Sequence, residues 1–107
     1  MADSRQSTEQ ALALARRAIR SGRDSAEIPD GYMHFDLALS IVDGCRSAIN
    51  MADAHDPNTI IPKLEMASAS LALVQVGIAE SSVKAARTYI DEAVVALRPF
   101  EAPKINR

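Results

Sequence analysis

The side chains in this sequence with the greatest capacity to bind a ligand are four arginines near its start. Arg16, Arg20 and Arg23 are spaced by four and three residues, which places them on one side of a helix. Arg17 lies beside them. Guanidinium groups in such a row are suited to phosphates or carboxylates, so these four residues are the candidate contacts to a partner or to a phosphate.

The charge distribution gives this arginine row three possible uses. Residues 1–23 hold five arginines and two acids, whereas the rest of the chain holds seven basic and twelve acidic residues. The row could therefore meet acidic surface of the same chain, a protein partner or a nucleic acid. The net charge of −2 and the pI near 5.6 argue against a general nucleic-acid binder, so we rank that use below the others.

Carboxylates also share a helix side, at Asp36, Asp43 and Asp53. Along a helix, seven residues span about 10 Å and ten span about 15 Å, which is too far for a compact acid/base pair. We interpret these carboxylates as a solvated face. We predict no catalytic residue, and therefore no enzyme activity.

A metal site would have to recruit His34 and His55, with Asp36, Asp53 or Asp56 nearby. The two histidines are 21 residues apart on one predicted helix, about 31 Å if that helix is straight. They could meet only across an antiparallel dimer. The sequence therefore predicts neither a metal nor a cofactor.

The single cysteine, Cys45, excludes an intramolecular disulfide, and it falls in a row of small residues with Ala38, Ala48 and Ala52. Cysteine in such a row is a compact apolar filler. A reducing, cytoplasmic location fits this cysteine usage. The polar start MADSRQSTEQ lacks the apolar stretch of a secretory signal, and the most apolar segment, residues 66–79, is too short to span a membrane.

The 107 residues are enough for one domain, but its core is made of small side chains, because 19 residues are alanine and only four are aromatic. Burial yields roughly 25 cal/mol per Å² of apolar surface, so each alanine contributes little. A single copy of the chain is therefore expected to be marginally stable. This favours a homodimer that hides a second apolar surface.

Apolar residues recur with helical spacing throughout the chain and predict an all-α fold. We expect an up-down bundle of about four helices, at approximately residues 7–21, 31–54, 60–79 and 82–98. Residues 1–6 would be a flexible start, residues 7–98 the single domain and residues 99–107 an extended tail. Gly22 can end the first helix in a left-handed conformation. The linker that follows, residues 22–31, would leave the first helix free to pack apart from the others or on a partner subunit.

The third and fourth predicted helices have the clearest apolar rows. The row of the last helix consists of Val83, Ala86, Ile90, Ala93, Val94 and Leu97. The third helix has one row through Leu64, Ala67, Leu71, Val74 and Ile78, and a second through Met66, Ala69, Leu73 and Val76. It is therefore expected to be the most buried. Its segment LVQVGI, residues 73–78, could instead form a strand, but the chain offers no strand to pair with it.

These features favour a non-enzymatic helical module that binds proteins, or a small regulatory or adaptor protein, and in both cases we expect a homo-oligomer. A nucleic-acid-associated regulator that uses the arginine row is the alternative. A small ligand-binding or enzymatic bundle, with a pocket between the second and fourth helices, comes third.

Overall fold

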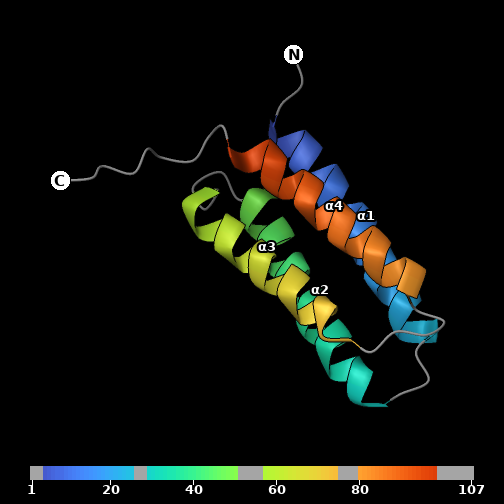
Figure 1. Cartoon of the computed structure of the whole chain (residues 1–107). Coiled ribbons are helices and arrows are strands. Elements are labelled where there is room, and N and C mark those ends of the chain that lie inside the picture. The colour runs from blue at the N-terminus through green and yellow to red at the C-terminus, as the bar shows by residue number, and fades with distance from the viewer. Residues whose placement is uncertain (1–3, 26–28, 51–56, 75–79, 99–107) are drawn as a thin grey trace.

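The computed structural model describes residues 4–25, 29–50, 57–74 and 80–98, and within them it contains four helices and no strand (Figure 1). The helices are α1 (Ser4–Ser25), α2 (Pro29–Asn50), α3 (Pro57–Ala72) and α4 (Glu80–Leu97). The predicted all-α bundle of four helices is confirmed. The extended tail predicted for residues 99–107 lies outside the described residues.

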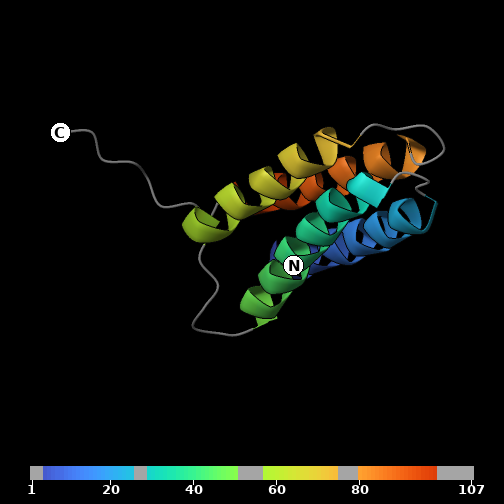
Figure 2. The same ribbon diagram turned by 90° about the horizontal axis from the view of Figure 1, so that it is seen from below.

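The helices run alternately up and down and form a ring in which each one packs against two others (Figures 1 and 2). Neighbours in the chain pack together, and the most extensive contact, between α1 and α4, closes the ring. The helix α1 is thus an integral part of the bundle. The idea that it packs apart, or on a partner instead, is wrong, because its apolar row is buried within its own chain.

Two prolines explain why the second and third helices begin earlier than predicted. Pro29 and Pro57 are the first residues of α2 and α3. Proline is well suited to this position, because its missing N–H has no partner there and its φ angle is already helical. With the predicted start near residue 60, Pro62 would lie in the first turn of α3, but because the helix begins at Pro57, Pro62 lies one turn further inside it.

The end of α1 also differs from the prediction. The helix continues to Ser25, and Gly22 is a buried residue within it. Among the described residues no glycine has a positive φ, so Gly22 is not a left-handed helix cap. Its role is in packing, because Phe35 of α2 and Ser82 of α4 approach its backbone closely.

The helix α3 ends at Ala72, well before the predicted end at residue 79. Two hydrogen bonds of the tighter i to i−3 type close it: Leu73 N–H donates to the carbonyl of Ser70, and Val74 N–H to that of Leu71, both at 3.1 Å. Leu73 and Val74 are therefore neither helix nor strand. The remainder of the LVQVGI segment lies outside the described residues.

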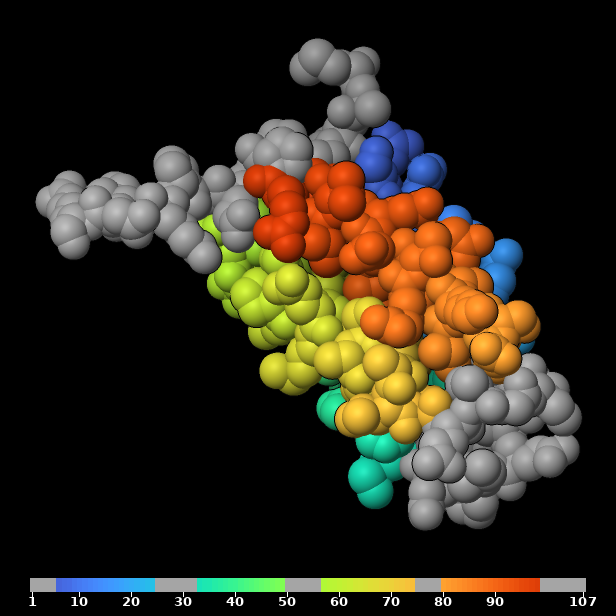
Figure 3. Space-filling view, in the orientation of Figure 1, coloured from blue at the N-terminus to red at the C-terminus, as the bar shows by residue number. Residues whose placement is uncertain are grey.

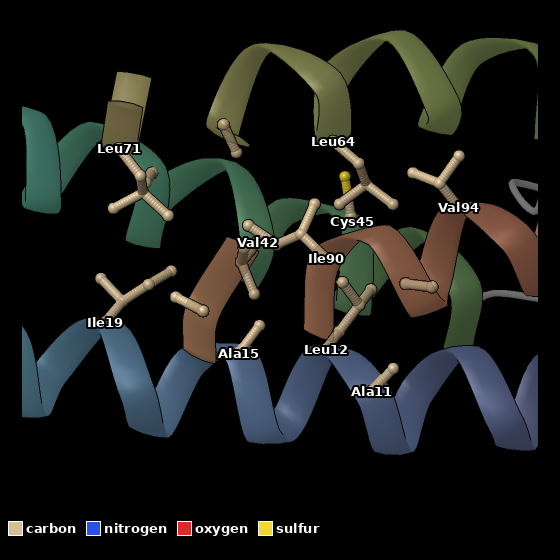
Figure 4. Close-up of a cluster of buried hydrophobic side chains, with 14 of the residues drawn as sticks. Ala11, Leu12, Ala15, Ile19, Val42, Cys45, Leu64, Leu71, Ile90 and Val94 are labelled. Atoms are coloured by element: carbon tan, nitrogen blue, oxygen red, sulfur yellow. The ribbon is translucent and has the colours of Figure 1, made fainter. Parts of the chain in front are cut away.

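Apolar side chains from all four helices meet in one core (Figure 4). The predicted rows of α3 and α4 are buried wherever they are described. The second apolar row of α3 is not: Met66 and Leu73 are 59% and 66% exposed. Among the described positions, α3 nevertheless has the largest share of buried residues, seven of sixteen, so the expectation that it is the most buried helix is confirmed.

Candidate functional site

The interface between α1 and α2 is set by matching arginine and aspartate pairs. Arg16 Nε donates to Asp43 Oδ1 at 2.8 Å, and Arg23 Nε donates to Asp36 Oδ1 at 2.6 Å. Arg23 also donates to the second oxygen of Asp36 at 3.4 Å, which makes this pair fork-like. The two arginines and the two aspartates are each seven residues apart, so the antiparallel helices form both pairs in one register.

A third ion pair continues along the same interface with the charges reversed. Arg46 of α2 lies 3.5 Å from Glu9 of α1. All three pairs are partly exposed, and pairs of this kind contribute from about 0 to 1 kcal/mol each. The acidic residues of α2 are therefore not simply a solvated face, because Asp36 and Asp43 hold two arginines of the predicted row.

The other two predicted arginines, Arg17 and Arg20, are exposed, and neither forms an ion pair with another described residue. Both line a hollow of about 540 Å³ on the α1–α2 side of the bundle. Its lining consists of Ala13, Arg16, Arg17, Arg20, Ser21, Asp24 and Arg46. We call this the arginine hollow. It gathers three of the four predicted arginines, and Arg23 lies outside its lining.

A smaller hollow of about 360 Å³ adjoins the arginine hollow and shares three of its lining residues, Arg16, Arg20 and Asp24. Arg23 contributes to this second hollow together with Asp36, its ion-pair partner. The structure thus separates Arg23, which lies outside the arginine hollow, from Arg16, Arg17 and Arg20, which line it.

Arg46 was missed as a candidate by the sequence interpretation. A signal for it existed, because Arg46 follows Asp43 by three residues and must share its side of α2. Its Nε is buried and has no hydrogen-bond partner in the described part of the chain. Unpaired buried donors are rare in proteins, so this atom marks a position where an acceptor would be favourable.

A second surface feature lies on α2 and α3, which pack side by side. Four of the six large apolar side chains that are exposed in the described residues lie on these two helices or directly after α3: Met33, Leu37, Met66 and Leu73. We call them the α2–α3 apolar face. Figure 3 shows the outer surface of α3 next to that of α4.

One hydrogen bond shows that the two halves of this face are neighbours. Ser70 Oγ of α3 donates to the backbone carbonyl of His34 in α2 at 3.5 Å. Ser70 is spaced four residues from Met66 and so shares its side of α3, and Leu73 N–H donates to the carbonyl of Ser70 in the turn that ends the helix. His34 lies between Met33 and Leu37 in the sequence. The exposed apolar residues of both helices therefore flank the same contact.

The exposed surface of α2 and α3 is also poor in charge. Asp36 is the charged residue among the exposed described positions of α2, and Lys63 and Glu65 are those of α3. The exposed surface of α4, by contrast, is rich in acids and bases: Glu80, Lys84, Arg87, Asp91 and Glu92. Depletion of charge together with exposed methionine and leucine is typical of the core of a protein interface.

Cys45 is buried among the core side chains, as Figure 4 shows, and forms no disulfide. Burial raises the pKa of its thiol, and the nearby charge of Lys63 lowers it by a smaller amount. A buried thiol with a raised pKa is a poor nucleophile. This position agrees with the interpretation of Cys45 as an apolar filler.

The residues weighed for a metal site are not brought together in the described part of the chain, which contains no cluster of three or more side chains able to ligate a metal. His55, Asp53 and Asp56 lie outside the described residues. Across the described helices, none combines the length and apolar character needed to cross a lipid bilayer. No family model, no curated protein and no solved structure matches this chain.

Proposed function

We propose that this chain is a non-enzymatic helical module that binds protein through its α2–α3 apolar face, and that its first partner is a second copy of itself. The observation that carries the proposal is the concentration of exposed large apolar side chains on α2, on α3 and in the turn directly after α3. Contiguous exposed apolar surface on a small domain marks an interaction site. With a single reduced, buried cysteine, we place this module in the cytoplasm.

The shortage of charge on this face supports self-association. In a twofold dimer the same patch of each copy faces its equivalent, so a charged group near the axis would meet a like charge. Asp36, the exposed charged residue of α2, is paired with Arg23 of α1, and the exposed side chains of Met33, Leu37, Ser40 and Ser47 are uncharged and avoid this repulsion. A homodimer formed here would bury methionine and leucine side chains without burying an unpaired charge.

Gly44 adds a geometric argument. It is exposed on α2, and a Cβ built on it would have no atom within 4 Å. Gly44 is therefore not needed for packing inside the bundle. It would let a helix of a second copy approach closely.

The mass of the full chain in solution tests this proposal. Sedimentation equilibrium at micromolar concentration should give the mass of two copies, and Leu37→Glu should reduce it to one. Leu14→Glu on α1 is the matched control, since Leu14 is 40% exposed and Leu37 48%. It should leave the dimer intact. A wild-type chain that stays monomeric throughout, or equal effects of both substitutions, would refute the proposal.

The alternatives have less support. A nucleic-acid regulator would use Arg16, Arg20 and Arg23, but two of these are engaged by aspartates. An enzymatic or ligand-binding bundle would need a pocket between α2 and α4. Within the described residues these helices do not pack on each other, and both hollows described above lie on the α1–α2 side.

A further inference from the structure

We infer that the arginine hollow is a binding site for a small multivalent oxyanion, a molecule with two or more neighbouring phosphate or carboxylate groups. This inference is independent of the proposed dimer, which uses the α2–α3 apolar face. Four guanidinium groups line the hollow, Arg16, Arg17 and Arg20 from α1 and Arg46 from α2. Their planar donor arrays match the oxygens of phosphate and carboxylate.

The donors of these arginines are largely unused within the described structure. Arg17 and Arg20 form no ion pair with another described residue. Arg16 directs its Nε to Asp43, and each guanidinium carries five N–H donors, so others remain for a ligand. The buried Nε of Arg46 lacks an acceptor. An anion in the hollow would supply acceptors to two helices at once.

The acidic residues nearby leave room for an anion. Asp24 is the one carboxylate among the lining residues. Asp43 and Glu9 are held in ion pairs with Arg16 and Arg46, and these pairs fix the positions of both arginines. Arg17 and Arg20 therefore supply the positive charge that is not already balanced by a partner, and Arg16 and Arg46 supply oriented donors.

The size and lining of the hollow favour a small anion over a nucleic acid. About 540 Å³ is the scale of a small-molecule site. No aromatic side chain is among its lining residues, so it offers no surface on which a base could stack. Both phosphate compounds and polycarboxylates have the required chemistry.

Isothermal titration of the full chain with inorganic pyrophosphate, and separately with citrate, tests the inference at low ionic strength. We expect saturable binding of at least one anion. The double variant Arg17→Gln/Arg20→Gln should raise the dissociation constant about tenfold or more, because each removes a charged hydrogen-bond donor. The thermal midpoint without ligand should not change.

The matched control is Lys84→Gln/Arg87→Gln on α4, which removes the same charge from two exposed residues with the same spacing. It should bind like the wild type. Tighter binding of pyrophosphate would assign the site to phosphate compounds, and tighter binding of citrate to polycarboxylates. The inference fails if neither anion binds, if both double variants weaken binding equally, or if a short oligonucleotide binds more tightly than either anion.

Discussion

The ring of Phe35 lies against the backbone of Gly22, so closely that a Cβ on Gly22 would be 2.8 Å from Cε1 of the ring. The same Cβ would lie 3.2 Å from Cβ of Ser82. Gly22 is thus the point where α1, α2 and the start of α4 converge. Since Phe35 is fully buried, its ring has little freedom to move aside.

We predict that Gly22→Ala destabilises the fold. A methyl group at this position overlaps the Phe35 ring, and overpacking of a core costs about 1–3 kcal/mol. Higher helix propensity returns at most about 1 kcal/mol. The net loss should be about 1 kcal/mol, measured by urea unfolding followed by circular dichroism. An unchanged or higher unfolding free energy would show that Phe35 can reposition.

Gly44→Ala should have the opposite effect. Gly44 also lies within a helix, but a Cβ there meets open space. Alanine reduces the conformational freedom of the unfolded chain, so the substitution should stabilise by about 0.5–1 kcal/mol. The measurement is the same urea titration, performed on the Leu37→Glu background so that any dimer is absent. Destabilisation on that background would mean that Gly44 has a packing contact within its own chain.

The contrast between these glycines shows what the sequence could and could not reveal. The helical period of apolar residues predicted four helices and the buried rows of α3 and α4. It could do so because a helix that buries one side needs apolar residues every three or four positions. Whether a glycine ends a helix or lies beneath an aromatic ring depends on its neighbours in space. Gly22 and Phe35 are 13 residues apart, and local spacing contains no information on their contact.

Local spacing likewise predicted only those parts of the candidate site that lie on a single helix. The arginine row was visible because its members share one helix, and the acids of α2 were visible for the same reason. Their pairing required the register of α1 against α2. That register could have been inferred from the equal seven-residue spacings of Arg16 with Arg23 and of Asp36 with Asp43. The hollow itself, which combines Arg46 with residues of α1, exists only once the two helices are packed.

The ion pairs of this interface give a prediction about register. Asp43→Arg should destabilise by about 0.5–1 kcal/mol at low salt, because it sets two arginines against each other. Adding Arg16→Asp should restore most of the loss by reversing the pair. A double-mutant cycle in urea, repeated at high salt, measures this coupling and should show it weaken as salt screens the charges. Additive losses would indicate that Arg16 and Asp43 do not interact in solution.

The buried thiol predicts a loss of stability at alkaline pH. Burial raises the pKa of Cys45 in the folded chain above its ordinary value of 9.0, so the folded state keeps its proton where the unfolded state has released it. Stability from this residue is therefore complete below the unfolded pKa and declines as the pH rises above it. Urea unfolding at about pH 7 and about pH 10 should show a smaller decline for Cys45→Ala than for the wild type.

Other titrating groups affect both proteins equally, so the difference between the two declines isolates the thiol. Reaction with an aromatic disulfide reagent gives a second readout. Labelling of Cys45 in the folded protein should be slow and should accelerate in urea, because the thiol becomes accessible only when the bundle opens. Rapid labelling without denaturant, or identical alkaline declines, would place Cys45 at the surface.

Ile90 tests the core itself, because α4 offers an exposed β-branched control on the same helix. Ile90 is 1% exposed and Val95 66%. Ile90→Asp would bury an unpaired charge among small side chains with few compensating contacts, so the chain should lose its cooperative unfolding transition. Val95→Asp should shift the unfolding free energy by less than about 0.5 kcal/mol. The effects of both substitutions on unfolding are measured by thermal melts monitored by circular dichroism. Equal melting curves for the two variants would mean that the register of α4 in the bundle is wrong.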